Sequence, residues 1–539
     1  MTEKSGAAPA GHGFERHAFT VTILTAASRF GGLAREACFS RLVGLTDAAS
    51  AFGFAFLVPN LFRRLFGEGA LSAALVPEQA RLEKRHPESA RRLASVMLLG
   101  LGLLLAAVVV VGELVLVVLG TEGGLATRLL AITLPYMPLV CITATAGAVL
   151  QVRGRFAPAA AAPMLLNATL VVALLLAWSL GEGPIGEKRI GIVAWGVVLA
   201  GVLQAGWALV ELRRTSVAAV AGSPNPLLRM RVRTSIRRVV RQSIPMMLGL
   251  GVLQLNTFLD GLIASWPTVV GPTILGYPYP LDETAMATLG YASRLYEFPL
   301  GVFGIAIATA IFPQLSREAG SPTAFASTIR RGIRLTMFIG VPASIGVILV
   351  RRSFAEVVFL GGAFDFEDAR RVAFVLLGYA VAIWSYSTTH LLVRAFYARR
   401  EPMTAVRIAM VVVGLNVVLN ITLVFGTGLG VAGLAWSTAI CAVVQTCVLL
   451  RCLERRTGRL IDFAVRRSIL ETVLSGGLMA IVVFTGMRSL STVLPGDAWW
   501  SALIELTVAT SIGAGVHLGL ARWRRRPELG WALGRTGGS

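Results

Sequence analysis

Long apolar stretches, separated by short polar breaks, run along almost the whole chain. An α-helix of about 20 apolar residues crosses a hydrocarbon core of roughly 30 Å, and about fourteen stretches reach that length. The pattern therefore predicts an all-α polytopic membrane protein. The expected spans lie near residues 17–42, 47–66, 94–120, 127–151, 158–180, 190–212, 242–266, 285–313, 332–350, 372–393, 403–425, 430–450, 468–488 and 499–521.

The composition agrees with this prediction. Of the 539 residues, 55% are hydrophobic and only 15% are charged. A soluble protein of this length could not bury so much apolar surface, because the core grows only slowly with chain length. Lipid must therefore be the solvent for most of the chain, and helices satisfy their backbone hydrogen bonds there.

The positive charge is distributed in a way that predicts orientation. The formal net charge is +21, and its arginines gather in alternate short loops between apolar stretches. By the positive-inside rule these loops and both termini are cytoplasmic, which requires an even number of spans. Because the bases are spread over many short loops and form no single continuous face, nucleic acid is not an expected partner. The loops are residues 81–92, 213–241, 317–334, 394–407 and 451–467, with the tail from 522. Residues 351–371, which carry both signs of charge, are expected to form a solvated outer loop.

An internal repeat relates the first six spans to the next six. Asn167-Ala-Thr-Leu-Val matches Asn420-Ile-Thr-Leu-Val, and Gln204 matches Gln445 in the span that follows each. An even number of spans per half makes the repeat parallel, with its axis along the membrane normal. We expect two pseudo-symmetric six-helix lobes with a cleft between them, plus two extra C-terminal helices. The expected parts are 17–214 and 242–456 for the lobes, 215–241 for a basic cytoplasmic linker, 466–521 for the extra helices and 522–539 for a basic cytoplasmic tail.

Several charged residues lie within or at the ends of spans, where they are costly and usually functional. An arginine there suits phosphate, because its planar fork donates two parallel hydrogen bonds and keeps its charge. The alternatives are local ion pairs, of Arg35 with Glu36 and of Arg294 with Glu297, and simple membrane anchoring by Arg63 and Arg64. Arg41 is a weaker candidate for phosphate binding. The candidate pyrophosphate-binding residues are Arg29, Arg35, Arg63, Arg64 and Arg294, and the candidate gating or ion-pairing acids are Glu36, Asp47, Glu68 and Glu297.

A second candidate site contains oxygen ligands. Asp260 is the only acid of its span, and Asn416 and Asn420 lie one turn apart on another. Hard cations prefer oxygen ligands, so these residues could bind a small cation or a proton. Hydrogen bonding between helices is the alternative.

Signatures of enzymes are absent from the sequence. None of the three lysines follows glycine, so there is no P-loop, and no Gly-x-Ser-x-Gly elbow occurs. The five histidines show no metal-ligand spacing. We expect a transporter without catalytic residues or a bound cofactor, driven by the membrane potential or by a coupling ion such as Na⁺ or H⁺.

Two sequence blocks resemble the MurJ/MviN lipid II flippases of the multidrug/oligosaccharidyl-lipid/polysaccharide (MOP) exporter superfamily. One is Pro59-Asn60-Leu-Phe-Arg63-Arg64-Leu-Phe-Gly-Glu68-Gly69, and the other is Tyr291-Ala-Ser-Arg294-Leu-Tyr-Glu297-Phe-Pro299. The resemblance implies transport of the lipid-linked peptidoglycan precursor from the cytoplasmic to the outer leaflet of the bacterial plasma membrane, for cell-wall biosynthesis.

The resemblance also implies roles for single residues. Arg29, Arg35, Arg63 and Arg294 would line a central cavity, and the two extra C-terminal helices would form a groove for the polyprenyl tail. Some family members bind sodium at positions matching Asp260, Asn416, Asn420 and Thr438. The implied partners are lipid II or a related polyprenyl-pyrophosphate glycolipid, membrane lipid and the cell-wall synthesis machinery. A flippase for another polyprenyl-linked glycan and a transport-inactive scaffold stay open as alternatives. A cation-coupled drug exporter would need acids in a largely apolar cavity, where this chain has mainly arginines, and a membrane glycosyltransferase would need a carboxylate cluster on a longer loop.

Overall fold

The fold was analysed in a computed structural model, which describes residues 28, 30–67, 70–118, 124–215, 226–494, 496 and 498–533. Arg29 and Glu68 lie outside these ranges, as do residues 17–27 of the span expected at 17–42. Residues 30–43 are helical. The next elements are α2 (Asp47–Phe62), the π-helical turn η1 (Arg63–Gly67), α3 (Ala70–Arg85), α4 (Pro87–Val118), α5 (Leu125–Thr133), α6 (Tyr136–Val152), α7 (Ala157–Ser179), α8 (Glu187–Arg214) and α9 (Pro226–Val269).

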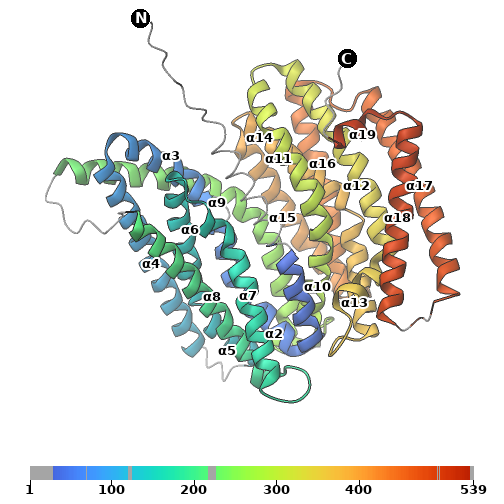
Figure 1. The fold of residues 1–539 in the computed structure, drawn as a ribbon, viewed down its shortest axis with the longest axis horizontal. Coiled ribbons are helices and arrows are strands. Elements are labelled where there is room, and N and C mark those ends of the chain that lie inside the picture. The colour runs from blue at the N-terminus through green and yellow to red at the C-terminus, as the bar shows by residue number, and fades with distance from the viewer. Residues whose placement is uncertain are drawn as a thin grey trace, which may run out of the picture. The chain divides into compact units, whose positions relative to one another are not determined.

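The remaining elements are again almost all helical (Figure 1). They are β1 (Thr273–Ile274), β2 (Tyr277–Pro278), α10 (Ala285–Pro299), the π-helical turn η2 (Leu300–Gly304), α11 (Ile305–Glu318), α12 (Pro322–Phe359), α13 (Phe366–Ala380), α14 (Ile383–Ala398), α15 (Pro402–Phe425), α16 (Ala432–Thr457), α17 (Phe463–Ser491), α18 (Trp499–Trp523) and α19 (Pro527–Ala532). The all-α class predicted from the apolar pattern is confirmed.

Membrane-spanning candidates can be counted within the described residues. Nine helical segments are long and apolar enough to cross a bilayer, and the count reaches eleven when each of two bent helix pairs is one span. The stretches expected at 47–66 and 242–266 are helical, in α2 with η1 and in α9, but are not among the eleven. The total of about fourteen spans therefore stays a prediction.

The chain divides into two compact units. Unit 1 comprises the described residues of Met1–Phe39 and Ala55–Leu250, and unit 2 those of Ser40–Phe54 and Gly251–Ser539. The first helix, α2 and α9 each contribute residues to both units.

In unit 1, α8 packs along α6 and α7, and α6 also packs against α3 and α4. Leu75, Leu93, Val149 and Leu212, from four of these helices, are buried together in one apolar cluster. The outer surface of α4 is different, because Leu103, Leu104 and other large apolar side chains there are exposed. Such a face suits contact with lipid tails.

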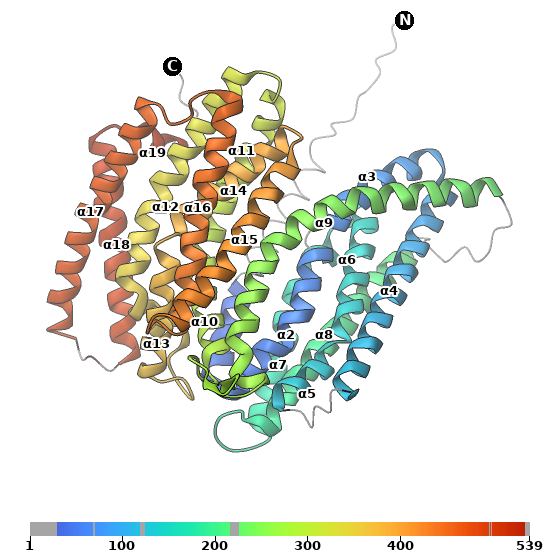
Figure 2. The same cartoon turned by 180° about the vertical axis from the view of Figure 1, so that it is seen from behind.

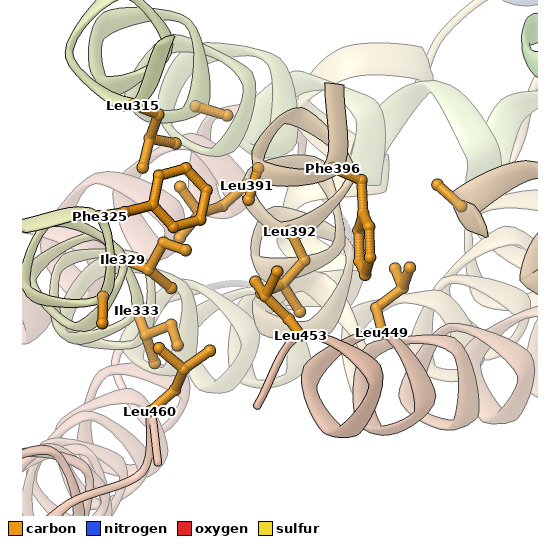
Figure 3. Packing of buried hydrophobic residues seen from close by; sticks show 14 of the residues in the cluster. Leu315, Phe325, Ile329, Ile333, Leu391, Leu392, Phe396, Leu449, Leu453 and Leu460 are labelled. Carbon is orange, nitrogen blue, oxygen red and sulfur yellow. The ribbon is translucent and has the colours of Figure 1, made fainter. Parts of the chain in front are cut away.

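In unit 2, α12 is the central helix, and it packs against α13, α14, α17 and α18. Figure 3 shows its first half interlocked with α11, α14 and α16 through large apolar side chains. The labelled residues are Leu315, Phe325, Ile329, Ile333, Leu391, Leu392, Phe396, Leu449, Leu453 and Leu460. Close packing of this kind fixes the helices as one body.

One segment differs from the sequence prediction, and another contains a short pair of strands. The expected loop at 351–371 is mostly helical, because α12 continues to Phe359 and α13 begins at Phe366. Its acid Glu356 is buried and pairs with Arg352 at 2.7 Å, so the charge is neutralised within the helix. The segment 267–284 contains the antiparallel pair β1–β2, whose turn residues Leu275 and Gly276 both have positive φ.

The segment 40–54 is fixed within unit 2. The Ala363 amide donates to the Arg41 carbonyl at 2.8 Å, and the Arg41 Nε donates to the Leu360 carbonyl at 3.1 Å. The Tyr291 hydroxyl donates to the Gly44 carbonyl at 3.0 Å. Arg41, a weaker arginine candidate, thus has a structural role in tying this segment to the loop between α12 and α13.

Candidate substrate and ion sites

A buried polar cluster joins three helices of unit 2. It consists of Asp260 on α9, Asn416 and Asn420 on α15, and Ser437 and Thr438 on α16. The Asn420 Nδ2 donates to Asp260 Oδ1 at 2.6 Å and to Asn416 Oδ1 at 3.0 Å. The Thr438 hydroxyl donates to Asp260 Oδ2 at 2.9 Å, and the Ser437 hydroxyl donates to Asn420 Oδ1. The structure thus brings together the four residues that the sequence and its family resemblance suggested as a cation site, namely Asp260, Asn416, Asn420 and Thr438.

Burial makes this cluster energetically important. Asp260 is 3% exposed, and Asn416, Asn420 and Ser437 are fully buried. A buried polar group costs free energy unless it is hydrogen-bonded, and this network satisfies both Asp260 oxygens. The hydrogen-bonding alternative considered for the two asparagines is therefore realised, and the cluster links α9, α15 and α16.

The donor set also fits a hard monovalent cation. One carboxylate, two amide oxygens and two hydroxyls supply oxygen ligands only, which hard cations prefer. Among the described residues no group of three or more His, Cys, Asp or Glu could hold a metal. In the present geometry the Asn420 amide nitrogen contacts Asp260 Oδ1, so a cation bound there requires that amide to rotate.

Both arginine-bearing blocks contain a π-helical turn. Arg63 and Arg64 open η1, four residues or more after Pro59 inside α2. Likewise α10, which carries Arg294, ends at Pro299, and η2 follows at once. Proline cannot donate a hydrogen bond to the carbonyl four residues before it, so in both blocks the helical ladder is already interrupted just ahead of the π-turn. Single π-turns inside α-helices occur frequently at functional sites.

The candidate arginines lie beside polar partners from their own helices. In unit 1, Arg35 donates to Glu36, and Arg63 donates to Asn60 Oδ1 at 3.0 and 2.9 Å. In unit 2, Arg294 pairs with Glu297 at 3.3 Å, and each side chain is about one-third exposed. The local pairs expected as alternatives are therefore present.

An aromatic stack was missed by the sequence analysis. The Tyr296 ring on α10 lies 4.4 Å from that of Tyr379 on α13 and 5.4 Å from that of Tyr386 on α14, measured between centroids. Tyr296 lies only two residues after Arg294. The three tyrosines belong to different helices, and no spacing along the chain connects them. Ser437 was also missed, although it adjoins Thr438.

Comparison with known proteins decides the family. Residues 39–500 match the family model described as "Lipid II flippase MurJ". The chain belongs to this family. It is 31% identical over 534 residues to a probable lipid II flippase MurJ of Vibrio cholerae, covering 93% of this chain and 94% of that protein. A probable lipid II flippase MurJ of Haemophilus influenzae is 30% identical to the chain, and the alignment covers 80% of this chain and 84% of that protein.

Solved structures agree on the fold. A lipid II flippase MurJ in an inward closed conformation superposes with a TM-score of 0.74 at 21% identity, covering 94% of this chain and 99% of that one. An inward-facing multidrug resistance MATE family transporter of the MOP superfamily gives a TM-score of 0.65 at 15% identity, covering 80% and 95%. Membership of the MurJ family makes this chain an integral inner-membrane transporter and not an enzyme.

Proposed function

We propose that this protein moves lipid II from the cytoplasmic to the outer leaflet of the inner membrane by alternating access. The observation that carries the proposal is the MurJ family match over residues 39–500, which includes both arginine-bearing blocks. The same match supports cell-wall biosynthesis as the process served. Both termini are cytoplasmic in this proposal, because the basic loops alternate with loops poor in bases.

The chemistry of the substrate explains the residues. A pyrophosphate attached to sugars cannot cross hydrocarbon without replacement of its water, whereas its lipid tail can stay in the bilayer. Arg35, Arg63 and Arg294 supply guanidinium donors for the phosphate oxygens, and Arg29 and Arg64 belong to the same proposed set. Asp47, Glu68 and the acids beside the arginines would release the anion by competing for those donors.

The driving force is proposed to be electrical, with help from a coupling ion. Moving a negative charge outward from a negative interior is favoured by roughly 2.3 kcal/mol per charge per 100 mV. Na⁺ or H⁺ bound at the Asp260 cluster is the proposed coupling ion, because the cluster offers only oxygen ligands around one carboxylate. Binding of radioactive Na⁺ to the detergent-solubilised protein, lost in Asp260→Asn, tests this step without measuring transport.

The function is tested by replacing the endogenous flippase with this chain in cells that depend on it. Outer-leaflet lipid II is then labelled in intact cells. We expect delivery by the wild type and by Arg317→Ala, an exposed control, and none by Arg294→Ala at equal membrane abundance. Wild-type delivery by Arg294→Ala would reject the arginine assignment. Accumulation of a different polyprenyl-linked glycan on depletion of the protein would instead support the alternative substrate.

A further inference from the structure

The first half of α9 carries a feature that the transport proposal does not use. Residues 226–244 belong to unit 1 and lead into the span expected at 242–266. One stripe of this helix is buried at intervals of four, three, four and four residues, which is the spacing of one α-helical face. The stripe comprises Leu228, Val232, Ser235, Val239 and Ser243.

This half of α9 is held on α3. Val239 joins the apolar cluster that contains Leu75 and Leu82 of α3. On the flank of the stripe, Arg238 donates to Glu78 Oε1 at 3.1 Å, and an Arg231 nitrogen lies 3.2 Å from His86 Nδ1. Both views of the ribbon show α9 running alongside α3 over this length (Figures 1 and 2). The orientation of the helix about its own axis is therefore fixed by packing and by two polar contacts.

The opposite face mixes arginines with aliphatic side chains. Arg229, Arg233, Arg237 and Arg241 recur every four residues, all are exposed, and none forms an ion pair among the described residues. At 100° per residue they lie across the helix from the buried stripe. Met230, Val240 and Ile244 share this face and are 62%, 45% and 51% exposed. No acidic residue occurs between positions 226 and 259.

Such a face is poorly suited to water and well suited to a membrane surface. Exposed aliphatic side chains cost free energy in water, whereas at the boundary between headgroups and acyl chains they are buried. Arginine extends its aliphatic stem along the same boundary and keeps its guanidinium among the phosphates. A cluster of four to eight bases beside a span, with no acids among them, attracts anionic lipid.

We propose that residues 226–244 of α9 form an arm lying in the plane of the cytoplasmic membrane surface. Its outer stripe, Arg229, Arg233, Arg237 and Arg241, binds the headgroup phosphates of anionic phospholipids. The stripe extends over about 18 Å, since a helix rises 1.5 Å per residue. A single diphosphate cannot contact both ends of the stripe, which favours several phospholipid headgroups over one substrate molecule. The inference does not depend on the transport function.

The test measures lipid binding by the full-length protein in detergent. Fluorescently labelled phosphatidylglycerol and phosphatidylcholine are titrated against the wild type and against a variant with Arg→Gln at 229, 233, 237 and 241. We expect the wild type to prefer phosphatidylglycerol, and the variant to lose about tenfold or more of that affinity, the scale set by removing several phosphate contacts. Added salt should weaken wild-type binding and affect the variant little.

Two further variants make the result specific. The control removes the same number of exposed cytoplasmic charges elsewhere, through Arg→Gln at 317, 407, 451 and 455, and should bind like the wild type. A variant with Arg→Lys at the four α9 positions keeps the charge and should retain binding, which excludes misfolding as the cause. Phosphatidylglycerol binding within twofold of wild type in the Gln variant, or equal loss in the control, overturns the proposal. A loss of lipid II binding with phosphatidylglycerol binding intact also overturns it, and assigns the stripe to substrate capture.

Discussion

Asn420 on α15 donates a hydrogen bond of 2.6 Å to the carboxylate of Asp260 on α9, and both side chains are buried in unit 2. Its counterpart in the sequence repeat, Asn167 on α7, donates to the Ser28 carbonyl at 3.1 Å. In each half of the chain, the asparagine of the fifth expected span thus contacts the first expected span of that half. The second half differs in having an ionisable group at the contact.

Asp260→Ala should destabilise the protein more than Asp260→Asn. Alanine removes the acceptor that the buried Asn420 amide and the half-buried Thr438 hydroxyl share, which costs about 2–3 kcal/mol. Asparagine keeps the shape and one acceptor oxygen, so its cost should be smaller. Thermal unfolding in detergent measures both variants, with Glu283→Gln in an exposed loop as a control. Equal midpoints for Asp260→Ala and wild type would show that the cluster is not structural.

Arg294→Lys should impair delivery of lipid II to the outer leaflet even though the charge is kept. Lysine is a point charge and cannot donate two parallel hydrogen bonds to a phosphate. We expect activity between that of the wild type and of Arg294→Ala, with unchanged membrane abundance. The matched control is Arg317→Lys, at an exposed position near the end of α11. Full activity of Arg294→Lys would mean that charge alone is required at this position.

Gly362→Ala should destabilise unit 2. Gly362 has a φ of 59°, and a Cβ there would collide with the Arg41 carbonyl oxygen. The strain and the clash together should cost about 1–3 kcal/mol. Gly428→Ala is the control, because Gly428 has an ordinary φ and open space around its Cα. The change is measured by thermal unfolding, and equal destabilisation by the two substitutions would contradict the role given to the Arg41 contact.

The C-terminal helix α19 should detach from unit 2 on acidification. Burial raises the pKa of Glu528, but the hydrogen bond from Ser468 and the charges of Arg526 and Arg334 outweigh it and hold that pKa below its ordinary value of 4.5. A carboxyl whose folded pKa is depressed stabilises the fold above its unfolded pKa. That contribution is lost as the pH falls through the folded pKa.

Glu528→Gln tests this dependence. At neutral pH the variant should lose about 1–3 kcal/mol, because it gives up hydrogen bonds to a charged group, measured as faster protease cleavage of the C-terminal tail. The difference from the wild type should shrink as the pH falls below 4.5. The control is Glu367→Gln, at a side chain that is 63% exposed. It should change neither the rate of protease cleavage nor the pH dependence of that rate. A difference that persists unchanged at acid pH would rule out the carboxylate as its source.

The sequence by itself determined the all-α class, most of the helices and the family. Apolar stretches of spanning length leave a chain little choice but helices in lipid, since unsatisfied backbone groups are too costly there. The blocks around Arg63 and Arg294 identified the family because their residues are close along the chain. The pairs of Arg35 with Glu36 and Arg294 with Glu297 were anticipated for the same reason.

Only the tertiary structure decided which distant side chains meet. Ser437 joining the Asp260 cluster, the stack of Tyr296 on Tyr379, and Arg41 binding the 360–363 loop each bring together residues from separate helices. The extension of α12 to Phe359 was likewise invisible in the charge pattern, because a helix neutralises Glu356 with Arg352 one turn away. Helical periodicity fixes which residues share a face, but which face meets which neighbour depends on the packing of all the helices together.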